Sequence, residues 1–426
     1  MVFYITYGIS LILLSYYLYK NGKRIELFNI FLMLFFVFFG PAFFIFNSTI
    51  DDVSTTEALC LTLTVISLLG GSILCNSVIY KPRQENVLIS SNQTVESFIN
   101  PNALLLLFAL TFLLFYLALF QYGGINNMLI VLSSGGDLTP DDLKGLRFDF
   151  KVDGWVGSII GYFETIGILI SMLMFSYTIQ KRRKLLLFLN VIFCFLIILW
   201  GASTLHKAIA FFYIIQLLLF FYLLNNMDWM WNTKIVLISS IVVFVLIIPI
   251  YMLLTSDDNL GDAATAALER ITAEPNRVLR EYFIWWPDHF PHKHGLNIRP
   301  IHAILGNGEF EPAYKTVVYQ YVPSDELNML VGTWPAIFIA DAWVDFSYFG
   351  VFLFSIIVGF TLRFIDVFLK YYKNSYGAAL FAALVGSLFT LIENALLTAF
   401  LTGGLIILPV LFKILVKNKE SKAIAD

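Results

Sequence analysis

Apolar stretches of about 20 residues, the length that an α-helix needs to cross a bilayer, recur from residue 3 to residue 416. Short polar segments separate them. Only 13% of the residues are charged and 59% are hydrophobic, whereas about 25% of a typical soluble protein is charged. Alternating strands of the kind that form transmembrane barrels are not seen in the sequence. The sequence therefore predicts an all-α polytopic membrane protein.

Eleven membrane-spanning helices are expected, at 3–20, 26–46, 57–80, 103–122, 155–179, 185–200, 208–224, 235–254, 348–369, 376–396 and 399–416. The first lacks a preceding basic region and a following cleavage site, so we expect a retained helix and not a signal peptide. Cys60, Cys75 and Cys194 fall inside expected spans and are interpreted as core residues. The expected parts are 1–254 with eight helices, a large loop at 255–347, and 348–426 with three helices and a tail.

Lys and Arg gather in alternate connections, which the positive-inside rule assigns to the cytoplasm. They are Lys20, Lys23, Arg24, Lys81, Arg83, Lys181, Arg182, Arg183, Lys184, Lys234, Lys370, Lys373, Lys413, Lys417, Lys419 and Lys422. The N-terminus and the segment 255–347 are then expected outside, and the C-terminus inside. All five histidines, namely His206, His289, His292, His294 and His302, then lie on or near the outer face.

The segment 255–347 is long for a connection and rich in aromatic and β-branched residues, as in YFIWWP and YKTVVYQYV. Because such a composition is not typical of disorder, we expect it to fold against the outer membrane face. Short helices are expected at 263–284 and 334–346. No Walker loop, HExxH, CxxC or GxSxG motif is present, so the chemistry is expected outside the cell and without nucleotide.

Three arginines of this segment are candidates for binding phosphate. Arg270, Arg277 and Arg280 share one face of the expected helix, and a guanidinium binds phosphate oxygens in bidentate fashion. The alternative is an ordinary solvated face, because Glu269, Glu274 and Glu281 are close by in sequence.

Two other expected outer connections carry cations. Arg147 is a second candidate anion contact or a surface ion-pair partner. In the turn GASTLHKAIA, His206 and Lys207 either contact a lipid phosphate or extend to the membrane interface.

His289, His292 and His294 are open to three interpretations: a metal cluster, a catalytic base or substrate contact, and polar packing. Pro287 and Pro291 make this stretch non-helical, so the spacing gives no metal-ligand geometry.

Charged residues inside expected spans need partners. Arg363 and Asp366 are expected to neutralise one another as a structural pair near the cytoplasmic end. Glu164 and Glu393 either face a hydrophilic cavity, with Glu393 better placed for external chemistry, or are proton-relay glutamates of a transporter. Asp51 and Asp52 either bind a cation or form a solvated turn.

Several of these features occur together: an arginine in an early external loop, the turn GASTLHKA, two arginines before YFIWWP, a following HGLN, and GTWPAIFIADAWVDFSYFGVFLFSIIVGF. Together they resemble the oligosaccharide repeat-unit polymerases, the Wzy-type O-antigen and capsule polymerases. DFSYFGVFLFSIIVG, after a proline and at the start of a span, carries the strongest likeness. The resemblance covers 200–208 and 268–360 by motif and the whole chain by architecture.

The resemblance implies a GT-C-type glycosyltransferase of polysaccharide biosynthesis, at the outer face of the cytoplasmic (inner) membrane, without metal or cofactor. A hydroxyl of one polyprenyl-diphosphate-linked oligosaccharide would attack the anomeric carbon of another with inversion, and polyprenyl diphosphate would leave. The expected partners are these lipid-linked donors and acceptors, membrane lipid and a chain-length regulator protein. Nucleic acid is not an expected partner.

The implied site residues fall into three groups. Diphosphate binding is assigned to Arg147, Lys207, Arg270, Arg277, Arg280 and Arg299. Catalysis is assigned to His289, His294 and Glu393, and stacking on sugar rings to Tyr282, Trp285, Trp286 and Tyr319. No residue is assigned to a metal. A glycan ligase and a transporter or flippase for a lipid-linked glycan remain alternatives, although the sequence shows no internal repeat of the transporter kind.

Overall fold

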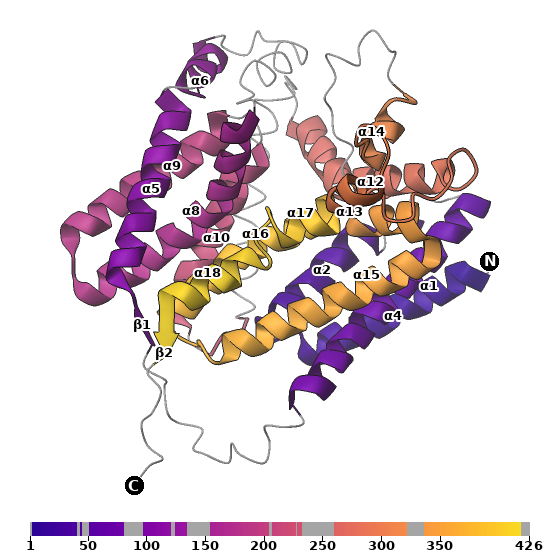
Figure 1. The fold of residues 1–426 in the computed structure, drawn as a ribbon. Helices are drawn as coiled ribbons and strands as arrows, with labels where there is room; N and C mark the ends of the chain where they lie inside the picture. The colour runs from indigo at the N-terminus through magenta and orange to yellow at the C-terminus, as the bar shows by residue number, and fades with distance from the viewer. Residues whose placement is uncertain are drawn as a thin grey trace. The chain divides into compact units, whose positions relative to one another are not determined.

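The computed structural model describes residues 2–40, 43–44, 51–80, 97–120, 124–133, 154–203, 207–226, 228–231, 260–321 and 336–418. Nearly all of the regular structure in this part is helical, which confirms the all-α class (Figure 1). The helices are α1 (Val2–Asn21), α2 (Leu27–Phe39), α4 (Asp52–Tyr80), α5 (Pro101–Phe120), α6 (Gly124–Ser133), α8 (Gly154–Lys181), α9 (Lys184–Ser203), α10 (Lys207–Asn225), α12 (Leu260–Trp285), α13 (Arg299–Leu305), α14 (Ala313–Val318), α15 (Phe338–Lys370), α16 (Ser375–Glu393), α17 (Leu396–Phe400) and α18 (Ile407–Leu415).

Seven helices in the described part are long and apolar enough to cross a membrane: Val2–Asn21, Asp52–Ile79, Pro101–Phe120, Gly161–Lys181, Lys184–Gly201, Phe338–Lys370 and Ser375–Glu393. The helix content of the chain is thus that of a multi-pass membrane protein. Apolar helices that are shorter lie at Leu27–Phe39 and Ala210–Asn225. The expected span at 235–254 lies outside the described residues.

The last expected span, 399–416, is wrong as a single helix. It is divided into α17 and α18, and Gly404 lies between them with a φ of +88°. Glycine adopts this left-handed conformation without strain, which makes the pair Gly403 and Gly404 a natural end for a helix. The expected span 26–46 is not one continuous helix either, since α2 ends at Phe39. Gly40 precedes a proline, where helical geometry is disfavoured.

α15 contains a break at Phe346 (φ −138°, ψ 17°) and Ser347 (φ +55°, ψ −145°). The part before the break corresponds to the short helix expected at 334–346, although it begins at Phe338. The part after it corresponds to the span expected at 348–369. The break therefore separates the last polar turns of the loop segment from the membrane-crossing part of the helix.

The chain forms two compact units. The first comprises Met1–Leu88, Met230–Asp366 and Phe389–Thr398, and the second comprises Ile89–Trp229, Val367–Leu388 and Ala399–Asp426. This division reflects how the helices pack. It does not coincide with the three parts expected from membrane topology, and those parts stay a prediction.

In the first unit, α1 packs on α2 and α4, and α12 packs on α2 and α4. α4 also lies against α15 at two glycines. A Cβ built on Gly71 would lie 2.3 Å from the carbonyl oxygen of Ile356, and one on Gly359 would lie 2.2 Å from that of Leu68. Small residues let helix backbones approach closely in a bilayer, where apolar burial drives no association. These glycines therefore set the close contact of α4 and α15.

In the second unit, α5, α8, α9 and α10 pack together around buried polar contacts. The Tyr213 hydroxyl donates to Ser171 Oγ (2.8 Å), and the Asn190 amide donates to the Ser171 carbonyl (2.9 Å). A short antiparallel ribbon, which the sequence did not predict, joins β1 (Ser97–Ile99) to β2 (Val416–Asn418), with Phe98 opposite Lys417 (Figure 1).

Candidate functional site

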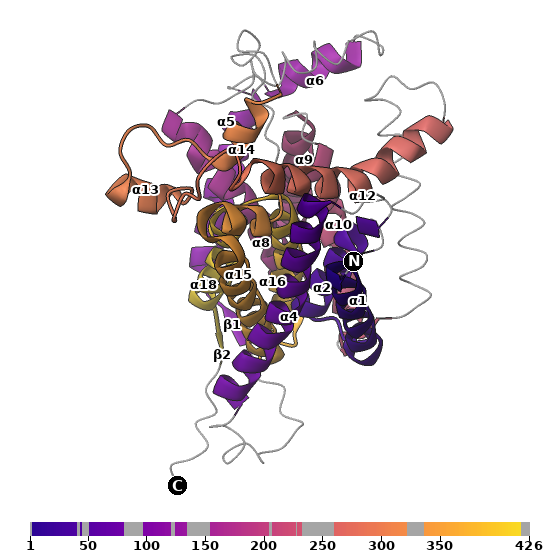
Figure 2. The same ribbon diagram turned by 90° about the vertical axis from the view of Figure 1, so that its right-hand side faces the viewer.

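α12 lies across the ends of α2 and α4 in the first unit (Figure 2). The helix expected at 263–284 is thus confirmed, with bounds Leu260–Trp285. One face of its last turns is buried, including Ala273, Asn276, Leu279 and Phe283. The Asn276 amide donates to the carbonyl of Phe38 (2.7 Å), near the end of α2. The buried face fixes which residues of α12 remain outside.

Arg277 is exposed on this helix, and Arg280 is half-buried and forms an ion pair with Asp51. Asp51 precedes α4, and it exchanges hydrogen bonds with Ser54: the Ser54 N–H donates to Oδ1 (2.7 Å) and the Asp51 N–H donates to Oγ (3.0 Å). This reciprocal pair caps the helix. Asp51 therefore pairs with a cationic side chain of the protein, Arg280. This ion pair holds Arg280 at the start of α4.

The electrostatics of Asp51 reflect these neighbours. Partial burial acts to raise the pKa of Asp51, but hydrogen bonds from Ser54 and the nearby Arg280 guanidinium outweigh it and lower the pKa below its usual value. Arg280 thus faces an ionised carboxylate at neutral pH. A guanidinium has five N–H donors and can contact more than one anionic group.

The aromatic residues after Arg280 divide into a buried and an accessible group. Tyr282 and Trp286 are buried, with ring centroids 6.1 Å apart. Trp285 is half-buried, and its ring lies 4.8 Å from that of His289. In this conformation Tyr282 and Trp286 pack in the interior and offer no face to a sugar.

Tyr319 and Tyr321 are exposed after α14. The Tyr321 ring lies 6.2 Å from that of Trp285, and its hydroxyl donates to the Glu281 carboxylate. Trp285 and Tyr321 therefore form an accessible aromatic corner beside His289, with Tyr319 on the same short segment.

The stretch 293–297, KHGLN, is bound to α15 at Val344 and Asp345. The N–H of Lys293 donates to the Val344 carbonyl (2.9 Å), and the N–H of His294 donates to the Asp345 carbonyl (3.0 Å). The N–H groups of Gly295 and Asn297 both donate to Asp345 Oδ1, at 3.0 and 3.1 Å. Gly295 has a φ of +92°, which a residue with a side chain adopts only with strain.

Asn297 joins a third segment, the start of α14, to these contacts. Its Nδ2 donates to Asp341 Oδ1, and its Oδ1 accepts from the N–H of Ala313 (2.7 Å), at the start of α14. The Lys293 ammonium donates to the carbonyl of Glu311 (2.7 Å). Burial lowers the pKa of Lys293, and the nearby carboxylates of Glu311, Asp345 and Asp341 oppose this effect.

We refer to Asp341, Asp345, Asn297 and Lys293 as the loop clamp. Its role was not predicted from the sequence, although Asp341 and Asp345 stand four residues apart in ADAWVD and so share a helix face. Asp345 is fully buried, and its Oδ2 has no hydrogen-bond partner among the described residues.

The histidines lie in different surroundings. His289 and His294 are exposed, and His294 has a φ of +50°. His292 Nδ1 lies 3.3 Å from the Val344 carbonyl, and the His302 ring lies 5.3 Å from that of Phe310. His206 lies outside the described residues. Among the residues described, no three His, Cys, Asp or Glu side chains are grouped so as to hold a metal ion.

The remaining predicted residues are spread along the chain. Arg299 is exposed at the start of α13, and Glu393 is exposed as the last residue of α16. Lys207 begins α10 and Arg270 lies within α12, but their side chains are outside the described part. Arg147 lies outside the described residues altogether.

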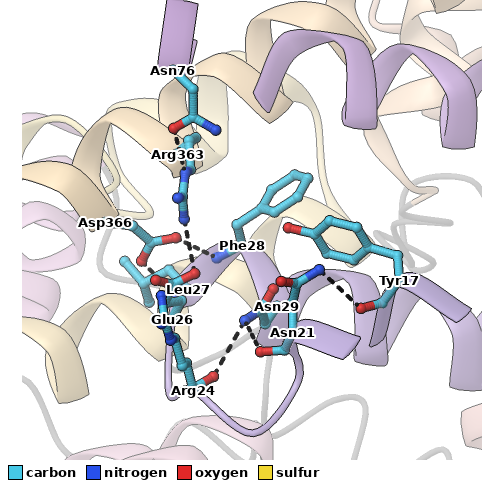
Figure 3. A network of polar contacts seen from close by, with 10 residues as sticks. All are labelled: Tyr17, Asn21, Arg24, Glu26, Leu27, Phe28, Asn29, Asn76, Arg363 and Asp366. Carbon is cyan, nitrogen blue, oxygen red and sulfur yellow. Dashed lines mark hydrogen bonds and ion pairs between the residues drawn. The ribbon is translucent and has the colours of Figure 1, made fainter. Parts of the chain in front are cut away.

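Arg363 and Asp366 interact electrostatically, as expected, but each makes its direct polar contacts with other groups (Figure 3). Arg363 forms its ion pair with Glu26 (2.8 Å) and donates from Nε to Asn76 (2.9 Å). Asp366 instead accepts from the N–H groups of Leu27 (2.7 Å) and Phe28 (3.1 Å). The first N–H groups of α2 have no partner inside the helix, so they bind a carboxylate. Asp366 therefore forms its hydrogen bonds with them and not with Arg363, which lies on the same helix, α15. The structural role expected for both residues fits these contacts.

Glu164, expected to face a hydrophilic cavity, accepts a hydrogen bond from Trp200 Nε1 (3.3 Å) within the second unit.

Comparisons with known proteins returned no matching family model, no matching curated protein and no matching solved structure.

Proposed function

We propose that the protein is a polysaccharide polymerase, which joins polyprenyl-diphosphate-linked oligosaccharides by inverting glycosyl transfer at the outer face of the cytoplasmic membrane. The observation that carries the proposal is the placement of cationic, aromatic and imidazole side chains on one segment at one end of the first unit. Arg277, Arg280, Trp285 and His289 follow one another there, from α12 into the turn after it.

The position of this segment relative to the membrane helices supports an external site. Asn276 and Arg280 contact the end of α2 and the start of α4. The basic turn Lys20–Arg24 lies at the opposite ends of α1 and α2, where the backbone carbonyl of Lys23 accepts a hydrogen bond from the N–H of Trp231 (3.0 Å). If the basic turn is cytoplasmic, as the positive-inside rule predicts, α12 is external.

In the proposed reaction, a hydroxyl of the acceptor sugar forms a bond to the anomeric carbon of the donor. The bond from that carbon to the diphosphate oxygen breaks, and polyprenyl diphosphate leaves with the electron pair. The proton of the hydroxyl passes to His289 or His294, or to Glu393. Arg277 and Arg280 stabilise the charge that develops on the diphosphate. The donor is already activated, so no nucleotide enters the reaction.

The accessible aromatic corner has the chemistry for holding sugar rings. Trp285 and Tyr321 present apolar ring surface next to hydroxyl and imidazole groups, and Tyr319 is exposed nearby. We assign sugar stacking to Trp285 and Tyr319, with Tyr321 added. Tyr282 and Trp286 support this corner from the interior.

The test is polymerisation by the purified protein with lipid-linked oligosaccharides extracted from its own source, without nucleotide. Arg277→Ala and Arg280→Ala should each reduce chain extension by about tenfold to a thousandfold, since each removes a donor that stabilises the departing charge. The measurement is the size distribution of the saccharide products by gel electrophoresis.

Arg24→Ala is the matched control, because Arg24 is an exposed arginine at the opposite end of the same unit. It should leave extension unchanged. Normal polymer from both α12 variants would refute the phosphate role of these arginines. A single transferred glycan in place of a ladder of lengths would identify a ligase instead.

A further inference from the structure

The outward face of α13 is apolar, the reverse of what a solvated helix shows. Ile304 and Leu305 are 81% and 71% exposed. Ile301 and His302, about one turn earlier, are half-buried. Exposed apolar side chains of this size at adjacent positions are costly in water, and they mark a surface that contacts a membrane or another protein.

α13 lies at the level where the membrane-crossing part of α15 begins. A Cβ built on Gly295 would lie 3.1 Å from the Phe346 ring and 3.5 Å from Ile301 Cδ1, so α13 and the break in α15 meet on this glycine. One turn beyond the break, Phe349 is 65% exposed on the helix that crosses the membrane. Figure 2 shows α13 projecting to one side of the start of α15.

The charge at the start of α13 also fits a bilayer. Arg299 is exposed at the first residue of α13, and no acidic residue lies within the helix RPIHAIL. An interfacial helix typically combines apolar side chains, which enter the boundary of headgroups and acyl chains, with cations that contact lipid phosphates.

We propose that α13 is an interfacial anchor, in which Ile304 and Leu305 insert between lipid headgroups and Arg299 contacts a lipid phosphate. The anchor holds the segment 286–321 at the membrane surface, because Asn297 of the loop clamp joins this segment to α15 two residues before α13. It does not depend on the proposed polymerase activity. Any lipid-modifying or lipid-binding function of this end of the protein would use it.

The experiment places a bimane fluorophore on Ile304→Cys in the full chain, reconstituted into vesicles of phosphatidylglycerol and phosphatidylethanolamine. The three native cysteines are buried, so the unsubstituted protein serves as the labelling control. Two quenchers are compared: a lipid with a nitroxide near the top of its acyl chain, and iodide in the water. Glu309→Cys is the matched control, since Glu309 is exposed on the same segment and only a few residues away.

The probe on Ile304→Cys should lose most of its emission to the nitroxide lipid and little to iodide, and the probe on Glu309→Cys should show the reverse. Adding Arg299→Glu should reduce the nitroxide quenching. Leu305→Cys repeats the measurement if Ile304→Cys does not fold.

Iodide quenching of Ile304→Cys as strong as that of Glu309→Cys would overturn the anchor, because the face would then be in water. Protection from both quenchers would overturn it as well, because another part of the protein would then cover the face.

Discussion

At the scale of single residues, Asp345 has the most demanding environment of the candidate site. It is fully buried, and one carboxylate oxygen accepts hydrogen bonds from the N–H groups of both Gly295 and Asn297. A buried N–H without a partner costs about 1–3 kcal/mol. This side chain therefore helps to fix the conformation of the stretch that carries His294, together with the backbone hydrogen bonds of Lys293 and His294.

Asp345→Ala should lower the free energy of unfolding by about 1–3 kcal/mol for each N–H that it leaves unsatisfied. Asp345→Asn should cost much less, because its Oδ1 can still accept both hydrogen bonds. Denaturant unfolding in mixed micelles measures the stability, and hydrogen exchange measures protection of the Gly295 and Asn297 amides. Asp288→Ala is the control, as Asp288 is exposed in the same segment. Equal protection in the Ala variant and the unsubstituted protein would contradict the clamp.

At the scale of elements, the network between α2 and α15 shows how helices are fixed inside an apolar protein (Figure 3). Glu26 and Arg363 are mostly buried, with side chains 11% and 14% exposed. Asp366 is also buried and binds the first N–H groups of α2. The network holds two carboxylates and one guanidinium, so the arginine is its critical member.

Arg363→Met should destabilise the protein by about 3–5 kcal/mol, the usual cost of leaving a buried charge without its partner. Glu26→Gln should cost less, because Arg363 then still has Asp366 nearby and its bond to Asn76. The double variant should recover part of the loss of Arg363→Met.

The same unfolding assay, arranged as a double-mutant cycle, measures these differences. Arg24→Met is the control, since its side chain is exposed beside the network. A loss in the double variant that equals the sum of the losses in the two single variants would show that Glu26 and Arg363 do not interact.

At the scale of the whole molecule, the two ends of the first unit differ in chemistry. One end carries the basic turn Lys20–Arg24, and the other carries α12 and the loop clamp. A membrane that separates these ends would place the basic turn in the cytoplasm. The proposed function requires this orientation, because lipid-linked repeat units would be joined outside.

A membrane-impermeant maleimide should label Asp288→Cys on intact cells, and Lys23→Cys only after the membrane is opened. Both positions are exposed, so a difference in labelling reports sidedness and not burial. The unsubstituted protein controls for the buried native cysteines. Labelling of Asp288→Cys from the cytoplasmic side alone would remove the basis of the proposed function.

The sequence by itself predicted the membrane class, the helices α1, α5, α8, α9, α10 and α16 to within a few residues, α4 with a start that is too late, and α12. These features depend on apolar length and periodicity, which are local properties of the chain. It also proposed Arg277, Arg280 and His289 as site residues; Arg277 and His289 are exposed, and Arg280 is half-buried in an ion pair. The pair Gly403 and Gly404 is a typical helix end, but the apolar composition continues through it and predicts a single span.

Only the tertiary structure decided which polar groups meet. Asp366 binds Leu27 across 339 positions of sequence, and Arg280 pairs with Asp51 across 229. Asp345 binds Gly295 across 50. The burial of Tyr282 and Trp286 was likewise settled by packing. A buried hydrogen bond depends on where two backbones come together, and residue type and spacing along one helix carry no record of the partner that arrives from a distant part of the chain.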